Sequence, residues 1–161
     1  MSSSERVQRQ PIAPMMRVLW QEVRDRIHLA FAEEGYGDVR AEHLAVLQYP
    51  GPDGQRPSAL AARSGMSRQA INHLVSHLER AGYLDRYTEP ADGNARLLRL
   101  TERGRRLYER IEAVAAAVEA EWAQQVGASR LEELRAILGD LLIARKDQSA
   151  RDTAAARRAP S

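Results

Sequence analysis

Side chains that donate hydrogen bonds gather on one stretch of the chain, where they recur at helical spacing. On a helix drawn at about 100° per residue from Arg68, they occupy roughly 0° to 180°. They are Arg68, Gln69, Asn72, His73, Ser76 and His77. The other half of the same helix is apolar and comprises Ala70, Ile71, Leu74, Val75 and Leu78. The spacing therefore predicts a helix that packs with one half and presents hydrogen-bond donors with the other.

The chemistry of this polar half favours nucleic acid. An ordinary solvated helix face mixes Glu and Lys, whereas Arg, Gln, Asn, Ser and His can contact base edges and phosphates in a major groove. This face carries no acidic residue before Glu79. The alternative is a merely exposed polar face.

The segment before this helix is typical of a helix-turn-helix that runs from Ser58 to Gly82. Gly65 is suited to the positive φ of a sharp turn between two helices. Ser67 is placed to cap the second helix through its side-chain oxygen. The small core between the two helices is predicted to hold Leu60, Ala61, Met66, Ile71 and Leu74.

A hairpin is predicted directly after the second helix. Its strands are expected at residues 84–88 and 96–100, and the turn residues Asp92 and Gly93 lie between them. A helix-turn-helix followed by such a ribbon is a winged helix, whose tip can lie along the DNA backbone or in the minor groove. Arg86 and Arg96 lie on or beside this ribbon, and arginine gains from the negative potential of a narrow minor groove.

Charge is concentrated on the same third of the chain. Residues 56–110 contain 11 arginines and 6 acidic residues, a balance of +5, although the whole chain carries only +2. Such a local positive excess is typical of a nucleic-acid interface, and a solvated arginine-rich surface is the alternative.

The remaining segments predict a mainly α fold with a small β-wing. We expect a winged helix at about residues 40–102, between long amphipathic helices at about 14–34 and 103–145. One domain would thus span residues 14–146. Residues 1–13 and 147–161 lack apolar periodicity and are expected to be disordered.

Several classes of function are disfavoured by composition. The chain has no cysteine, which excludes disulfides, thiolate catalysis and cysteine-ligated metals. No apolar run approaches the roughly 20 residues of a membrane span, and we expect a cytoplasmic protein without cofactor. No catalytic motif is visible, so we expect no enzyme. His73 and His77 have the spacing of a helical metal pair, but without a third ligand we expect no metal site.

The sequence resembles the MarR family of multiple antibiotic resistance regulators over about residues 14–146. The resemblance rests on the run Leu78-Glu79-Arg80-Ala81-Gly82-Tyr83-Leu84, on Arg86, Asp92 and Leu100-Thr101-Glu102-Arg103-Gly104, and on Leu60-Ala61 and Ser67-Arg68-Gln69. One position departs from the family pattern: Asn94 stands where an arginine usually follows the wing aspartate. Arg96, two residues further on, would face the same side of a regular strand.

The resemblance implies a homodimer whose first and last helices intertwine over a pseudo-palindromic operator in double-stranded DNA. The amphipathic helices agree with this, since they offer more apolar surface than a small winged helix can cover. We expect a shared core of Met16, Trp20, Val23, Trp122, Leu134, Leu138 and Leu141. The resemblance also implies a small aromatic or phenolic effector, and the candidate lining is Trp20, Arg24, His28, His43 and Tyr49. Their alternative roles are dimer core for Trp20 and plain surface for the histidines.

The sequence thus predicts a bacterial, sequence-specific DNA-binding transcriptional regulator, a ligand-responsive repressor that acts as a homodimer. The predicted DNA contacts are Ser67, the polar half of the helix, Arg86 and Arg96, with Asp92 and Asn94 at the wing. The alternatives are a winged helix used for protein–protein interaction and an architectural DNA binder without sequence preference.

Overall fold

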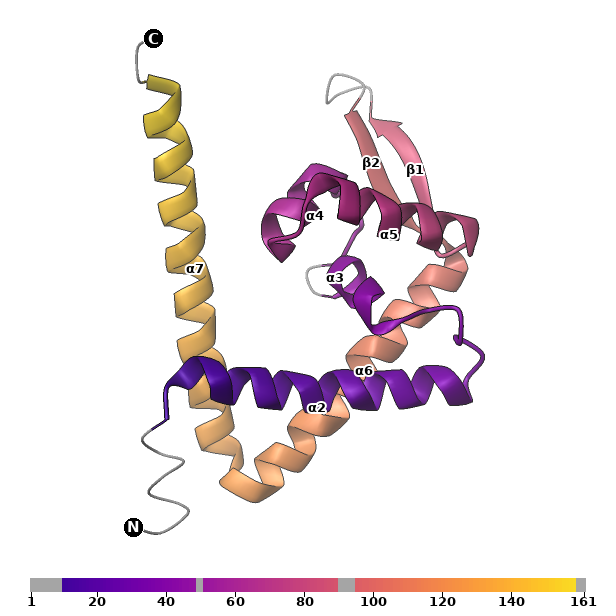
Figure 1. Ribbon diagram of the computed structural model, residues 1–161. Helices are drawn as coiled ribbons and strands as arrows, with labels where there is room; N and C mark the ends of the chain where they lie inside the picture. Colours follow the sequence, from indigo (N-terminus) through magenta and orange to yellow (C-terminus); the bar gives the residue numbers. More distant parts are fainter. Residues whose placement is uncertain (1–9, 49–50, 90–94, 159–161) are drawn as a thin grey trace. The chain divides into compact units, whose positions relative to one another are not determined.

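The computed structural model describes residues 10–48, 51–89 and 95–158, and its elements follow the predicted order (Figure 1). They are α2 (Ile12–Glu33), the 3-10 turn η1 (Ala41–His43), α3 (Leu44–Leu47), α4 (Pro57–Ser64), α5 (Arg68–Arg80), β1 (Leu84–Glu89), β2 (Ala95–Leu100), α6 (Glu102–Val126) and α7 (Ala128–Arg158). This order confirms the mainly α fold with a small β-wing. None of the described helices is long and apolar enough to span a membrane.

The helix-turn-helix forms as its local signals predict. Pro57 lies in the first turn of α4, where its missing N–H costs nothing. Gly65 ends α4 with φ 68°, and the Ser67 hydroxyl oxygen accepts from the Ala70 N–H at 3.1 Å to cap α5. The two helices pack through buried side chains that include Leu60 and Ile71.

The wing is an antiparallel hairpin whose register runs from Leu84 opposite Leu100 to Glu89 opposite Ala95. The free edge of β2 is paired with the loop that precedes α4. The Gly54 N–H donates to the Leu98 carbonyl, and the Leu98 N–H donates to the Gln55 carbonyl. The loop therefore adds a short third segment to the wing, a pairing that the sequence pattern does not reveal.

The chain divides into two compact units, Met1–Ala116 and Ala117–Ser161. In the first unit, the second half of α2 is buried through Val23, Ile27, Ala30 and Phe31, whereas its first half is not. Met16 keeps 47% of its surface exposed and Trp20 keeps 41%. The apolar stripe predicted along α2 is therefore covered over only half its length in a single chain.

The second unit holds the end of α6 and all of α7. Gly127, at φ 93°, separates the two helices, and Arg135 of α7 donates to Glu119 of α6 at 2.7 Å. The apolar side of α7 is open, with Leu134 42% exposed and Leu141 62% exposed.

One expectation about this unit is wrong. The sequence predicted a helix that ends at Arg145 and a disordered tail from Asp147, but α7 continues to Arg158. Residues 147–158 contain neither glycine nor proline and are rich in Ala and Arg, which have high helix propensity. Residues 1–9 and 159–161 lie outside the described residues.

The wing joins α6 through a junction that requires a glycine. The Thr101 hydroxyl donates to the Gly82 carbonyl at 2.6 Å and accepts from the Gly104 N–H at 3.0 Å, and the second bond caps α6. The Thr101 N–H donates to the Tyr83 carbonyl at 3.1 Å. A Cβ atom at position 104 would collide with that same carbonyl oxygen of Tyr83. The first turn of α6 thus packs directly on the backbone where the wing begins.

Gly104→Ala should therefore destabilise the protein by about 1–3 kcal/mol, the usual cost of overpacking, because the obstacle is backbone and cannot rotate away. The measurement is urea unfolding of the purified variant followed by circular dichroism. Gly139→Ala is the matched control, since a Cβ there meets nothing within 4 Å and should stabilise α7 by up to about 1 kcal/mol. Equal stability of the two variants would contradict the packing of this junction.

Candidate nucleic-acid interface

The outer half of α5 is exposed and the inner half is buried. Arg68, Gln69, Asn72 and His73 are exposed, and Ser76 is half-buried. The inner side buries Ile71, Leu74, Val75 and Leu78. Within the described residues, no hydrogen bond or ion pair engages the side chains of Arg68, Gln69, Asn72 or His73. The predicted separation of the two halves is confirmed, and the outer half keeps its donors available to a ligand.

The wing carries further positive charge beside this helix. Arg96 is exposed, and together with Arg86, Tyr87 and Thr88 it lines a shallow hollow on the hairpin. Arg86 is half-buried, and its Nε donates to Glu79 at 2.8 Å, which fixes the guanidinium against the end of α5. The predicted wing residues Asp92 and Asn94 lie outside the described residues.

His77 is the one member of the polar half that turns toward the protein. Its Nε2 donates to the Asp38 carbonyl at 2.8 Å. Its ring stacks on His43, with 4.4 Å between ring centroids and 18° between ring planes. At about 180° from Arg68, His77 marks the edge between the polar and apolar halves. Because the His77 ring already contacts both Asp38 and His43, we do not include it among the residues proposed to contact bases.

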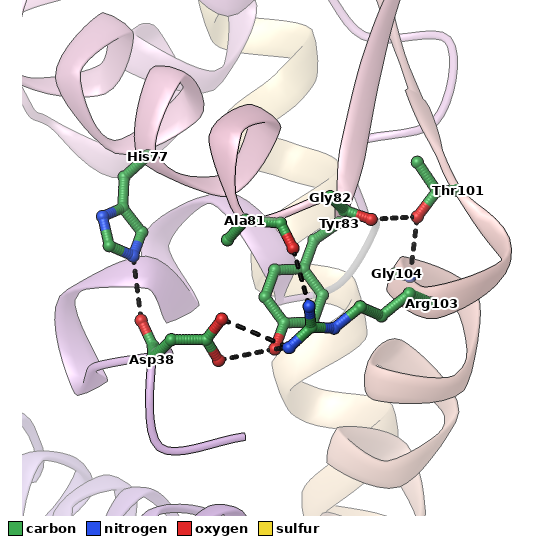
Figure 2. A network of polar contacts seen from close by, with 8 residues as sticks. All are labelled: Asp38, His77, Ala81, Gly82, Tyr83, Thr101, Arg103 and Gly104. Atoms are coloured by element: carbon green, nitrogen blue, oxygen red, sulfur yellow. Dashed lines mark hydrogen bonds and ion pairs between the residues drawn. The ribbon is translucent and has the colours of Figure 1, made fainter. Parts of the chain in front are cut away.

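Asp38 lies at the centre of a polar network that joins three segments (Figure 2). The Tyr83 hydroxyl donates to Asp38 Oδ1 at 2.7 Å. Arg103 donates to Asp38 Oδ2 at 3.2 Å, to the Tyr83 hydroxyl at 2.8 Å and to the Ala81 carbonyl at 3.0 Å. Burial of Tyr83, together with its hydrogen bond to Asp38, raises the pKa of the phenol to about 12, so the hydroxyl stays a donor at neutral pH. The network ties the α2–η1 connection to the end of α5 and the start of α6.

Sequence reasoning missed this network. Asp38 is separated from its partners by 45 and 65 positions in the chain, in a segment without a recognisable motif. Tyr83 and Arg103 stand in the runs that carry the family resemblance, which is the only signal that could have drawn attention to them. Their partner is visible only in three dimensions.

The candidate effector residues occupy contrasting environments. Trp20 and His28 on α2 are exposed, and Tyr49 lies outside the described residues. Arg24 is half-buried, and its Nε is enclosed without a hydrogen-bond partner among the described residues. His43 is buried, and burial, followed by the proximity of His77, lowers the pKa of its imidazole.

The described residues contain no group of three His, Cys, Asp or Glu side chains placed to hold a metal ion. His73 is exposed, whereas His77 is turned to Asp38 and His43. The metal-pair spacing of these two histidines is therefore not matched by a pair of side chains that converge on one point.

Comparison with known proteins adds independent information. The MarR family model matches residues 44–94, which cover the helix-turn-helix and most of the wing. No protein of curated function matches the sequence. Among solved structures, the MarR family protein Rv2887 of Mycobacterium tuberculosis, in complex with salicylic acid, is 25% identical with a TM-score of 0.59. The match covers 82% of this chain and 96% of that protein.

Two further structures share the fold. CouR from Rhodococcus jostii, bound to p-coumaroyl-CoA, is 23% identical with a TM-score of 0.64, over 82% of this chain and 92% of its own. A mutant of S. aureus MepR bound to an oligodeoxyribonucleotide is 20% identical with a TM-score of 0.52, over 84% of this chain and 98% of its own. The helix-turn-helix and most of the wing thus match the MarR family model, and the chain shares the winged-helix fold of these MarR family structures over most of its length.

Proposed function

We propose that this protein is a sequence-specific transcriptional repressor that binds an operator in double-stranded DNA as a homodimer and responds to a small aromatic effector. The observation that carries the proposal is the outer half of α5, where four polar or basic side chains are exposed and unengaged within the described residues. As operator DNA lies in the cytoplasm of a bacterium, the protein is expected there.

The dimensions and chemistry of α5 suit a major groove. Its 13 residues span about 20 Å, and a groove about 12 Å wide admits one helix. Gln69 and Asn72 can form paired hydrogen bonds with adenine, and Arg68 can do so with guanine. Ser67 at the helix N-terminus and Ser76 are placed for phosphate contacts. The DNA-bound structure of the MepR mutant supports this use of the fold.

The wing arginines are assigned to the DNA backbone or minor groove. Arg96 is exposed on β2, and Arg86 is held by Glu79 in the same hollow. The wing aspartate and Asn94 are assigned to the same contact on the family resemblance. Arg96 is proposed to supply the guanidinium that Asn94 cannot.

Substitution of the base-contacting face should reduce discrimination more than overall affinity. We expect a lower ratio of operator affinity to random-DNA affinity for each of Asn72→Ala, Gln69→Ala and His73→Ala. The reduction should be about 5- to 150-fold, which is the discrimination that one good base contact provides. The measurement is fluorescence anisotropy with both DNAs at one fixed salt concentration, since affinity depends on salt.

Gln21→Ala is the matched control, because it removes an exposed glutamine from the unrelated helix α2. It should leave the ratio unchanged. A ratio that no α5 variant alters, with binding retained, would favour an architectural binder. Absence of any DNA binding would favour a protein-interaction module.

Dimerisation is proposed from the apolar surface that a single chain leaves open. Of the expected shared core, Met16, Trp20, Leu134 and Leu141 are exposed, and Trp122 and Leu138 are half-buried. Val23 is buried within its own chain and is not available to a partner. The remaining residues lie on helices at the two ends of the sequence, as intertwined terminal helices of two copies require.

A charge on the apolar side of α7 should break the dimer. Leu134→Asp and Leu141→Asp should convert the protein to a monomer at micromolar concentration in sedimentation velocity, and should weaken operator binding. Ala136→Asp introduces the same charge on the opposite side of α7, about 200° from Leu134, and should remain dimeric. A wild-type protein that sediments as a monomer would refute the dimer directly.

An aromatic acid is the effector class that the candidate residues suit. Trp20 offers an aromatic face, and the enclosed Nε of Arg24 is a donor in need of an acceptor such as a carboxylate. Salicylic acid and p-coumaroyl-CoA in the Rv2887 and CouR structures support this class. His28, His43 and Tyr49 complete the proposed lining, although the buried His43 would require a movement of η1.

Trp122→Phe leaves Trp20 as the only tryptophan, because the chain has two. Titration of this variant with salicylate should quench the fluorescence saturably and lower operator affinity at the same concentrations. Arg24→Met in the same background should weaken the quenching, whereas Arg17→Met, which alters an exposed arginine of α2, should not. Quenching without saturation, or unaffected by Arg24→Met, would overturn the assignment.

A further inference from the structure

Two histidines, His43 of η1 and His77 of α5, form a stacked pair. His43 is only 2% exposed, and its ring lies 4.4 Å from that of His77, centroid to centroid. Each ring also forms a hydrogen bond with a backbone group. His43 Nδ1 accepts from the Arg40 N–H at 2.8 Å, and His77 Nε2 donates to the Asp38 carbonyl at 2.8 Å. The pair therefore fastens the connection after α2 to the last turns of α5.

Protonation of His43 is incompatible with this arrangement. A neutral imidazole has one acceptor nitrogen, and His43 uses it toward the Arg40 N–H. A proton on Nδ1 would set two donors against each other and release the bond that closes η1. It would also place a buried positive charge against the ring of His77.

The surrounding charges favour the neutral form overall. Burial, His77 and Arg40 lower the pKa of His43, and the carboxylate of Glu42 opposes them. Asp38, the other nearby acid, is occupied by Tyr83 and Arg103. The carboxylate of Glu42 is thus the compensation that remains for a positive charge on His43, and its influence is smaller than that of burial or of His77.

We propose that the His43–His77 pair is a protonation-sensitive latch, which holds α5 in its DNA-binding position near neutral pH and releases it in acid. The proposal rests on the proposed role of α5 as the DNA-reading helix. Release would free the final turns of α5 from Asp38 while its apolar side stays packed. Operator binding would then have to re-form the contacts of His43 and His77, and this cost would lower the affinity for the operator.

The direction of the pH dependence follows from the lowered pKa. An unfolded histidine titrates near 6.5, and His43 in the folded chain titrates below that value. The folded protein therefore binds fewer protons, so the stability that neutral His43 contributes is complete above about pH 6.5 and falls as the pH drops through the folded pKa. His73 is exposed on the proposed DNA face and would contact DNA directly, so the affinity test below is done without its imidazole.

The first test needs no DNA. In the full chain with ¹³C-labelled histidine, the Cε1–H resonance of His43 is assigned by its loss in His43→Asn and followed by NMR from about pH 8 to 5. We expect a midpoint below that of free histidine, with the Arg40 amide resonance shifting at the same pH. A His43 midpoint at the free value would overturn the latch, whether or not the protein binds DNA.

The second test measures operator affinity at about pH 7.5 and 5.5 in a His73→Gln background, which removes the imidazole from the proposed DNA face. We expect a loss of up to about tenfold at pH 5.5, because that pH lies about one unit below the pKa of a released histidine. His43→Asn keeps an acceptor for the Arg40 N–H, and His77→Gln keeps a donor for the Asp38 carbonyl, and neither side chain titrates. His43→Asn should abolish the pH dependence, because the buried imidazole is gone. His77→Gln should reduce the dependence, since it removes the neighbouring ring but leaves His43 buried against the Arg40 N–H. This smaller loss carries the test if His43→Asn does not fold.

The same loss in acid in both variants, or no loss in the His73→Gln protein, would overturn the proposal. Failure to bind DNA at any pH would instead refute the proposed function, and the NMR titration would still decide whether His43 behaves as the latch requires.

Discussion

The buried half of α5 carries most of the anchoring, because the side chains of Arg68, Gln69, Asn72 and His73 form no hydrogen bond or ion pair within the described residues. A helix of this length is marginal by itself in water, so its shape depends on packing. Ile71, Val75 and Leu78 supply that packing, Ser67 closes the first turn and His77 fastens the last one. The outer side chains are therefore presented on a fixed backbone without being bound to it, which is what a surface that reads a groove requires.

Tyr83, in the segment that follows α5, connects this helix to α6 and to the segment after α2 through its carbonyl and its hydroxyl. Its carbonyl meets Thr101 and leaves no room for a side chain at Gly104, and its hydroxyl lies between Asp38 and Arg103. Further along α6, Arg110 donates to Glu34 just after α2 at 2.7 Å. A ligand that displaced α2 against α6 would therefore act on the same contacts that position α5. This arrangement gives the proposed effector a direct physical route to the proposed DNA face.

Local features of the fold could be predicted from the sequence because each depends on neighbouring residues. Gly65 and Ser67 act within one turn of their own positions, and the separation of apolar and polar residues on α5 needs only helical geometry. The pairing of Gln55 with Leu98 and the contacts of Asp38 join distant positions, so periodicity could not reveal them. The contacts of His77 with Asp38 and His43 could not be predicted, because His77 lies at the boundary of the two halves, where a projection cannot say which neighbour is present. The end of α7 differs from the prediction because residues 147–158 lack apolar periodicity but have high helix propensity.

Selection of bound sequences from a random double-stranded DNA pool tests the central claim most directly, since it requires no prior operator. The account predicts enrichment of one sequence family that contains two inverted half-sites, with centres about 10–10.5 base pairs apart, as two-fold symmetry of a winged-helix dimer demands. Recovery of the pool without enrichment, or of a single half-site without symmetry, would contradict it.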